Sequence, residues 1–441
     1  MVLPSSVSQC IRTLENARYQ AYCVGGCVRD HCLGLTPADF DLCTSAQPDQ
    51  IQAVFEEYSL VLAGKKHGTV GVVTADGVVE ITTFRTEGAY RDNRHPDWVA
   101  FVTQVEEDLA RRDFTINAMA WSPSRGFADP FGGREDLKNR TLRTVGDPGQ
   151  RFREDSLRIL RGVRFAVRYG LTVEENTMDA MVSHAHLMDN LARERVFSEL
   201  CKLLPLVTTQ DLLRFAPILA AVLPPLALQF GFQQHSPHHA YDIFTHTAHV
   251  VAGVPGDLPL RWAALLHDIG KPATFTLDEA GRGHFLGHAG VGEKMANELL
   301  LELKAPNALR QQVTALIHHH MTRIPDDKKL LRRWMGRLGP DFLEQLLLLQ
   351  EADMGSKGTG KPQEMDQFPR IRELLAEIRQ EDACLCLKDL ALNGRDLMAL
   401  GITGKDIGQT LNHLLEQVLD EALPNDREAL LTYIHNREEP Q

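Results

Sequence analysis

Hydrophobic positions alternate with polar ones in the first part of the chain, roughly over residues 21–122. Glycine and β-branched residues dominate three segments there, at residues 22–30, 68–84 and 97–102. A period of two in apolar positions is typical of strands. The dipeptide Asp76-Gly77 divides the second segment and predicts a hairpin turn. This part of the chain therefore predicts a small sheet.

From about Asp136 onward the strand pattern stops, and apolar residues recur at intervals of three and four, as in residues 151–170 and 192–204. That spacing is typical of amphipathic helices. The fold class predicted is α+β: a head with a mixed sheet and helices, followed by an all-α body. Eleven of the 18 histidines fall between His235 and His320, which marks a separate unit. We place the domains at residues 1–145, 146–230, 231–360 and 361–441.

Composition narrows the class of protein. The chain has 441 residues, of which 43% are hydrophobic and 24% charged, as in folded multidomain proteins. Its net charge of −12 means that a polyanionic partner would need a local cluster of cations. The eight cysteines form neither a disulfide framework nor a CxxC zinc pair, and the start resembles no signal peptide, so we expect a cytosolic protein. The apolar residues 215–232 contain three prolines and predict a buried connector rather than a membrane span.

Candidate chemistry in the head begins with a pair of carboxylates. Asp39 and Asp41 flank Phe40, and in a strand both side chains would lie on one face. Such a pair binds Mg²⁺, and two such ions activate a 3′-hydroxyl and stabilise a pyrophosphate leaving group. A DxD sequence alone is more often a solvated turn, but here the pair Gly25-Gly26 and then Arg29 precede it within 17 residues, which favours a phosphate and metal site. Glu80 is a possible third metal ligand, on a strand that we expect beside the first.

Five motifs in order resemble one known family. They are GGCVRDHCLGLTPADFDLCTS (residues 25–45), RRDFTINA (111–118), DPFGGREDL (129–137), REDSLRILRGVRF (153–165) and RERV (193–196). This series is similar to that of the class II tRNA nucleotidyltransferases, which are the CCA-adding enzymes and the related bacterial poly(A) polymerases. The resemblance implies a DNA polymerase β-like nucleotidyltransferase head, Mg²⁺ as cofactor, and tRNA, CTP and ATP as partners. It also implies that residues 146–230 form a neck with a nucleotide-selecting helix, and that the tail contacts tRNA.

The resemblance assigns roles to single residues. Gly26, Arg29 and Arg112 would contact phosphate, while Asp113 and Asn117 would recognise the ribose. Independently of the family, Asp155 and Arg158 are three apart on a predicted helix and share a face, so they offer an acceptor and a planar donor to a base edge. On that face Arg161 and Arg164 would supply cations for the triphosphate. An ordinary helix with salt bridges is the alternative for this pattern.

The histidine-rich body predicts a second metal site. His246, the dipeptide His267-Asp268 and Asp353 follow an H…HD…D order, and His288 and His320 are weaker candidates. Together they offer ligands for one or two divalent ions. The order resembles the HD phosphohydrolase superfamily, which implies Ni²⁺, Co²⁺ or Mn²⁺ as cofactor and phosphomonoesters or 2′,3′-cyclic phosphates as substrates.

The predicted function is addition of the 3′-terminal CCA to tRNA without a nucleic-acid template, together with an HD phosphohydrolase activity. One alternative is an A-adding enzyme or a poly(A) polymerase, and a remoter one is an HD hydrolase with a non-catalytic RNA-binding head. Residues 84–96 correspond to the family's flexible loop, which enzymes that add only CC lack in functional form. We infer no membrane association and no particular protein partner.

Overall fold

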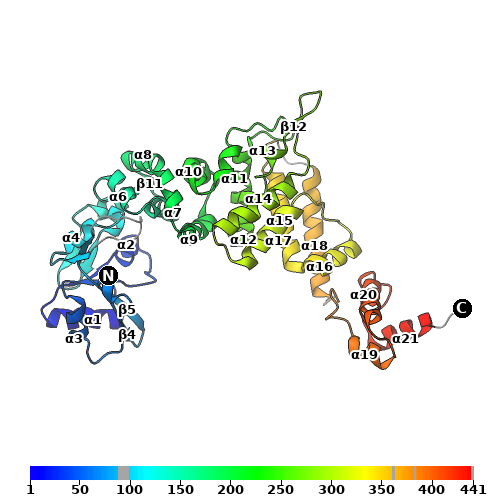
Figure 1. Cartoon of the computed structure of the whole chain (residues 1–441), viewed down its shortest axis with the longest axis horizontal. Helices are drawn as coiled ribbons and strands as arrows, with labels where there is room; N and C mark the ends of the chain where they lie inside the picture. Colours follow the sequence, from blue (N-terminus) through cyan, green and yellow to red (C-terminus); the bar gives the residue numbers. More distant parts are fainter. Residues whose placement is uncertain (88–98, 360–362, 382–383, 439–441) are drawn as a thin grey trace. The chain divides into compact units, whose positions relative to one another are not determined.

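The computed structural model describes residues 1–87, 99–359, 363–381 and 384–438, and most of the predicted loop at 84–96 therefore lies outside the described residues. The chain divides into two compact units (Figure 1). Unit 1 comprises residues 1–207 and 214–227, and unit 2 comprises residues 208–213 and 228–441. These limits follow from the packing of residues within each unit. The division into four domains at residues 1–145, 146–230, 231–360 and 361–441 remains a prediction.

A seven-stranded mixed sheet forms the head of unit 1. Its strands, in spatial order, are β3 (Leu60–Val61), β4 (Thr69–Thr74), β5 (Gly77–Thr83), β2 (Leu42–Thr44), β1 (Ala21–Val24), β8 (Ala120–Ser122) and β9 (Gly126–Ala128). Strand β2 pairs antiparallel with β1 and parallel with β5. The hairpin between β4 and β5 turns at Ala75 and Asp76, one residue earlier than predicted, and Gly77 with φ 123° begins β5.

Five helices surround this sheet, and a second antiparallel pair of strands lies outside it. The helices are α1 (Ser5–Asn16), α2 (Gly26–Cys32), α3 (Pro48–Val54), α4 (Val105–Ala110) and α5 (Gly133–Lys138); the strands are β6 (Arg85–Glu87) and β7 (Val99–Phe101). Side chains from β1, β2 and α4 form one buried cluster that includes Tyr22, Cys43 and Leu109. The candidate phosphate-binding glycines Gly25 and Gly26 directly follow β1, and the candidate metal ligands Asp39 and Asp41 directly precede β2.

The rest of unit 1 is mainly helical. Its helices are α6 (Pro148–Glu154), α7 (Leu157–Tyr169), α8 (Glu175–Ser183), α9 (Arg193–Leu203) and, from Arg214 onward, α10 (Thr209–Val222). Close packing of α7 depends on Gly162, because a Cβ there would lie 2.9 Å from the Phe114 ring. The strands do not stop entirely at Asp136 as predicted, since β10 (Thr141–Leu142) and β11 (Thr172–Val173) form a short parallel pair. Two residues each are too few to show as an alternating pattern.

The described residues of unit 2 form helices and one short hairpin of β12 (Thr276–Leu277) and β13 (Gly283–His284). Its helices are α11 (Ile243–Gly253), α12 (Leu258–Leu266), α13 (Lys271–Thr274), α14 (His288–Glu302), α15 (Asn307–His319), α16 (Lys328–Leu338), α17 (Pro340–Gly355), α18 (Gln367–Gln380), α19 (Gly394–Ala399), α20 (Lys405–Leu419) and α21 (Arg427–Glu438). Helix α12 is buried on all sides, with Trp262 and Leu265 fully inaccessible. The α+β class predicted from the sequence is confirmed.

The apolar segment at 215–232 continues α10 and then forms a 3₁₀ helix at Pro224–Gln229. Pro217 lies inside α10. Most of its large side chains are buried, among them Phe215, Ile218 and Leu226. No helix among the described residues has the length and apolar character needed to cross a membrane.

Candidate functional site

A sharp turn at Gly25 connects β1 to α2 at the first candidate site. Gly25 adopts φ 75°, a left-handed conformation that glycine tolerates best. A Cβ at this position would lie 3.0 Å from Arg112 Nη1. Glycine therefore lets the Arg112 guanidinium approach the turn, and Gly25, Gly26 and Arg112 line one cavity.

The paired carboxylates come directly before β2 rather than within it. Asp41 remains in line with the sheet, because its carbonyl accepts a 3.0 Å hydrogen bond from the Val24 amide. Asp39 and Asp41 are both exposed, as is Glu80. Glu80 lies on β5, the parallel neighbour of β2, as the sequence predicted. Partial desolvation raises the pKa of Asp41, the charges of Glu80 and Asp39 raise it further, and Arg112 opposes them.

An arginine-rich cavity of about 360 Å³ adjoins Asp41 in unit 1. Six arginines and three aspartates line it together with five other residues: Gly25, Gly26, Arg29, Asp41, Arg111, Arg112, Asp113, Asn117, Asp155, Leu157, Arg158, Arg161, Phe165 and Arg195. The excess of guanidinium groups is the local positive cluster that a chain of net charge −12 needs for a phosphate ligand.

A buried network orders the floor of this cavity. Arg29 Nη1 donates to Asn117 Oδ1 at 2.6 Å, and Asn117 Nδ2 donates to Asp113 Oδ1 at 3.1 Å. Arg161 Nε donates to the other oxygen of Asp113 at 2.9 Å. Burial alone would raise the pKa of Asp113, but Arg161 and Asn117 outweigh it and lower this pKa to about 2. The predicted ribose-recognising residues and two of the predicted phosphate ligands thus belong to one hydrogen-bonded group.

Asp155 and Arg158 do not lie on one helix, as the sequence analysis had assumed. Asp155 is extended, with φ −142° and ψ 101°, and it separates α6 from α7. Its Oδ1 accepts from the Leu157 amide at 3.1 Å, since the first amides of a helix lack intrahelical partners. Both side chains still line the cavity, and Arg158 in the first turn of α7 is bound by Glu154 at 2.8 Å.

Arg164 departs from the prediction. It does not line the cavity beside Arg161 but lies buried against α9, where its Nε donates to Glu199 Oε2 at 2.6 Å. The two arginines are three apart on α7, but their side chains diverge toward different carboxylates. A residue that the sequence analysis did not single out takes a place in the cavity instead: Arg195 on α9 donates to Asp155 Oδ2 at 2.9 Å. The RERV motif that contains it was the available signal.

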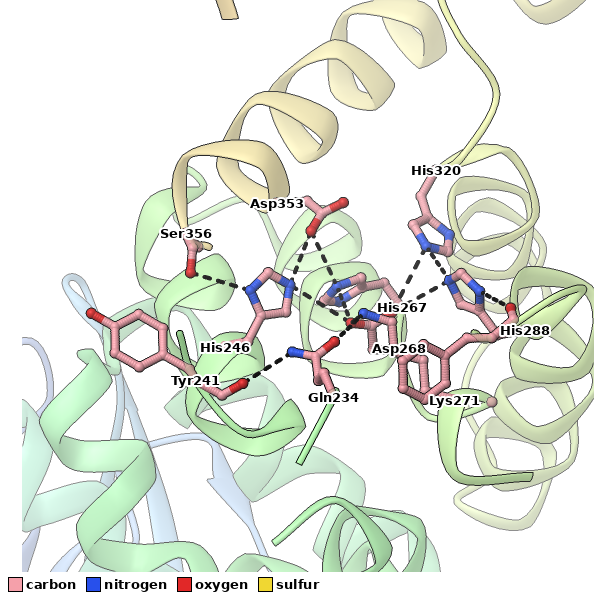
Figure 2. Close-up of polar contacts among 12 residues, drawn as sticks. Gln234, Tyr241, His246, His267, Asp268, Lys271, His288, His320, Asp353 and Ser356 are labelled. Atoms are coloured by element: carbon pink, nitrogen blue, oxygen red, sulfur yellow. Dashed lines mark hydrogen bonds and ion pairs between the residues drawn. The ribbon is translucent and has the colours of Figure 1, made fainter. Parts of the chain in front are cut away.

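Six buried or partly buried side chains of unit 2 converge on a second site (Figure 2). His246 comes from α11, His267 and Asp268 follow α12, His288 begins α14, His320 follows α15, and Asp353 lies near the end of α17. Five of them form two possible metal-ligand groups, His246 with His267 and Asp268, and Asp268 with His288 and His320. The sequence analysis named every one of these residues.

Hydrogen bonds orient the imidazoles of this second site. His246 Nδ1 lies 3.2 Å from the Ser356 carbonyl, and His267 Nδ1 lies 2.8 Å from the Ala264 carbonyl. A carbonyl only accepts, so each Nδ1 carries the hydrogen and each Nε2 is available to a metal. His246 Nε2 lies 2.9 Å from Asp353 Oδ1, and His267 Nε2 lies 3.1 Å from Asp268 Oδ2.

The surrounding charges set the protonation of the second site. Burial would raise the pKa of Asp268, but His267 and Lys271 hold it well below its usual range. Lys271 Nζ lies 2.7 Å from Asp268 Oδ2 and donates to Gln234 at 2.9 Å. Burial lowers the pKa of His320 to about 4, which keeps this ring neutral at pH 7. Lys271 follows the HD dipeptide by three residues and was not predicted to belong to the site.

Comparison with known proteins identifies the family. The Poly A polymerase head domain matches residues 21–143, the probable RNA and SrmB-binding site of polymerase A matches residues 170–227, and the putative tRNA nucleotidyltransferase domain 2 matches residues 275–434. The CCA-adding enzyme of Levilactobacillus brevis is 36% identical over 96% of each chain. The chain belongs to the CCA-adding enzyme family. The CCA-adding enzyme of Geobacillus thermodenitrificans is 33% identical over 98% of this chain and 96% of its own.

Solved structures of the CCA-adding enzyme family agree with this result. A crystal structure of the Bacillus stearothermophilus CCA-adding enzyme in complex with CTP is 29% identical, covers 99% of this chain and 98% of its own, and has a TM-score of 0.69. A Thermotoga maritima CCA-adding enzyme complexed with tRNA shares the fold, with 20% identity over 99% of this chain and 97% of its own and a TM-score of 0.61. The nucleotidyltransferase head predicted from the motifs is thereby confirmed.

Proposed function

We propose that this chain is a cytosolic CCA-adding nucleotidyltransferase that extends tRNA with C, C and A from CTP and ATP. One observation carries the proposal: the cavity beside Asp41 combines six arginines with Asp155 and Arg158. Guanidinium groups suit a triphosphate, and a carboxylate beside a planar donor suits the Watson–Crick edge of a base. The arginines and the pair Asp155 and Arg158 all belong to unit 1.

Within this proposal each group of residues binds a different part of the substrate. Arg29 and Arg112 bind phosphate at the Gly25-Gly26 turn, and Asp113 with Asn117 orients the ribose. Asp155 and Arg158 select the base. The exposed carboxylates Asp39 and Asp41 fit Mg²⁺, because they offer only oxygen ligands and Asp41 lines the cavity, and Glu80 is a further candidate. The ion, when bound, stabilises negative charge on the attacking and leaving oxygens.

The test uses tRNA transcripts that end before CCA, after C and after CC, each with CTP, ATP or both. We expect two C residues from CTP alone on the first transcript, one A from ATP alone on the third, and complete CCA with both. A long A tail would instead favour a poly(A) polymerase, and A addition without C addition would favour an A-adding enzyme.

The second site supports a second activity, a divalent-metal-dependent phosphohydrolase of the HD type. The observation that favours it is the convergence of His246, His267, Asp268 and Asp353, whose facing N and O atoms lie 2.9–4.0 Å apart. Two imidazoles with two carboxylates fit Ni²⁺, Co²⁺ or Mn²⁺. We expect the chain to hydrolyse 2′,3′-cyclic nucleotides or phosphomonoesters. One of these ions should activate the hydrolysis, and a chelator should abolish it. Absence of hydrolysis with all three ions would contradict this activity.

A further inference from the structure

Asp108 on α4 is a fully buried carboxylate that lies just outside the arginine-rich cavity. Its two oxygens accept hydrogen bonds from two arginines that do line this cavity. Oδ1 accepts from Arg111 Nε at 3.0 Å and from Arg111 Nη2 at 2.9 Å, and Oδ2 accepts from Arg112 Nη2 at 3.3 Å. One buried carboxylate therefore holds two adjacent cations of the nucleotide cavity.

The order of these residues in the chain brings them together. Asp108 precedes the two arginines by three and four residues, and side chains at these intervals lie on one face of a helical turn. Burial would raise the pKa of Asp108, but Arg111, Arg112 and the Arg85 amide, which donates to Oδ1 at 3.2 Å, hold this pKa below its usual value. Asp108 is thus ionised at neutral pH.

Arg112 is placed between Asp108 and the phosphate-binding turn. Its Nη2 donates to Asp108, whereas its Nη1 lies so close to Gly25 that a Cβ there would be 3.0 Å away. Among the described residues, Asp108 is the only carboxylate that pairs with Arg112, and Arg112 Nε is buried without a hydrogen-bond partner. The direction of this guanidinium group therefore depends on Asp108.

The charges at this point favour an anionic ligand. Two adjacent guanidinium groups repel each other, and a carboxylate between them offsets the repulsion. Two positive charges against one negative charge still leave one positive charge for the cavity. Arg111 and Arg112 keep 19% and 21% of their side chains exposed, whereas Asp108 keeps 1%. The arginines can reach a ligand, and the carboxylate cannot.

We propose that Asp108 is a positioning residue for nucleotidyl transfer, which orients Arg111 and Arg112 toward the triphosphate that CTP and ATP share. This role rests on the function proposed above for the cavity. The β- and γ-phosphates leave as pyrophosphate, so loss of Asp108 should weaken the binding of CTP, ATP and pyrophosphate by the same factor. A role only in stability would not select the phosphate groups.

The experiment measures by calorimetry how the full-length chain binds CTP, ATP and inorganic pyrophosphate with Mg²⁺ and without tRNA. Asp108→Asn keeps the side-chain shape and removes the charge, and we expect it to weaken all three ligands about 10-fold, since it removes charge-assisted hydrogen bonds. The matched control is Asp136→Asn. Asp136 is a buried carboxylate of the head whose partner at 3.2 Å, Arg143, does not line the cavity. This control should lose stability in urea but keep all three affinities within about twofold.

A double-mutant cycle separates positioning from stability. In an Arg111→Lys/Arg112→Lys background no guanidinium group is left to orient, so adding Asp108→Asn should lower pyrophosphate affinity by less than about twofold. Equal losses in both backgrounds would overturn the proposal, as would unchanged affinities in folded Asp108→Asn. If Asp108→Asn does not fold, Asp108→Glu replaces it, because it keeps the charge but displaces it by one methylene. We then expect a smaller loss, again equal for the three ligands, and wild-type affinities would overturn the proposal.

The outcome for Asp108 can be distinguished from that for the proposed function. Weaker pyrophosphate binding in Asp108→Asn, with no extension of tRNA transcripts by the wild-type chain, would support the positioning role and contradict CCA addition. Normal extension by the wild-type chain, with unchanged affinities in Asp108→Asn, would do the reverse.

Discussion

Asp113 shows how a single residue serves both stability and binding. Its carboxylate is buried and accepts hydrogen bonds from Asn117 and Arg161 and from the Phe114 amide at 2.8 Å. Removing one partner of a buried pair leaves the other charge without compensation. The residue that we propose to orient the ribose therefore also holds α7, which carries Arg161, to the head.

We expect Asp113→Asn to destabilise unit 1 in a pH-dependent way. The folded pKa of about 2 is below the unfolded value of about 3.9, so the ionised form contributes roughly 2 to 3 kcal/mol above pH 4. This contribution is lost as the pH falls from about 4 to 2. Urea unfolding should show the full loss at pH 7 and a smaller difference at pH 3. The exposed Asp189→Asn should change neither value, and an equal loss at both pH values would contradict the pairing.

At the metal-binding edge, we expect Asp39→Asn and Asp41→Asn each to reduce both C and A incorporation by at least about 100-fold, because loss of a ligand removes roughly 3 kcal/mol of transition-state stabilisation. Single-turnover extension of a transcript ending in CC, with excess ATP, measures A incorporation, and extension of a transcript ending before CCA, with excess CTP, measures C incorporation. Asp76→Asn, in the β4–β5 turn, is the matched control. Wild-type rates in both active-site variants would remove these carboxylates from the mechanism.

At the scale of elements, the break between α6 and α7 decides the geometry of the nucleotide cavity. Asp155 is extended there, so its carboxylate both caps α7 and contacts Arg195 of α9. Arg195 Nη1 is buried without a hydrogen-bond partner among the described residues, although the arginine lines the cavity. Helix α9 thus positions the group that we propose to read the base.

We expect Arg195→Ala to relax the choice of CTP over UTP by roughly 10-fold or more, while tRNA affinity changes little. Without Arg195 the Asp155 carboxylate loses a charge-assisted hydrogen bond, which contributes about 1.5 to 3 kcal/mol. The ratio of kcat/KM for the two nucleotides measures the effect, and Arg195→Lys should restore part of it. Arg153→Ala, on the exposed side of α6, is the control. Unchanged selectivity with weaker tRNA binding would assign Arg195 to the tRNA instead.

The sequence predicted elements better than the directions of their side chains. Alternation and helical spacing located the sheet and the helical body. The H…HD…D order located four of the six side chains that converge on the second site, and His288 and His320 were the weaker candidates. Residue spacing wrongly placed Asp155 on the helix of Arg158, because the break between the two helices does not change the spacing of apolar residues. It wrongly placed Arg164 in the cavity, because the partner of this arginine, Glu199, is 35 residues away. Arg195 was missed because its partner Asp155 is 40 residues away, although the RERV motif marked its position. Lys271 was missed although its ion pair with Asp268, three residues earlier, is local.

At the scale of the whole molecule, the two candidate sites belong to different compact units. The first offers arginines and carboxylates, and the second offers imidazoles and carboxylates. We therefore expect the two chemistries to be separable by mutation.

His267→Ala/Asp268→Ala should abolish metal-dependent hydrolysis of 2′,3′-cyclic nucleotides and leave CCA addition within about twofold of wild type, since no ligand of the first site changes. Asp39→Asn should give the opposite pattern. Both activities are measured on the same purified preparations, with circular dichroism to verify folding. A folded double variant that lost nucleotide addition in proportion to hydrolysis would contradict two independent sites.

The course of helix α10 limits where chimaeras can be joined that combine unit 1 of one relative with unit 2 of another. Its first residues, 209–213, belong to unit 2, whereas Arg214 onward belongs to unit 1, where Phe215, Ile218 and Leu219 are buried. A chimaera joined at residue 207 would leave the transplanted unit 1 without these side chains and expose its apolar interior. A junction after Ala227 keeps unit 1 whole, but it carries residues 208–213 of the donor into the recipient's unit 2. Functional chimaeras therefore require donors matched at those six positions.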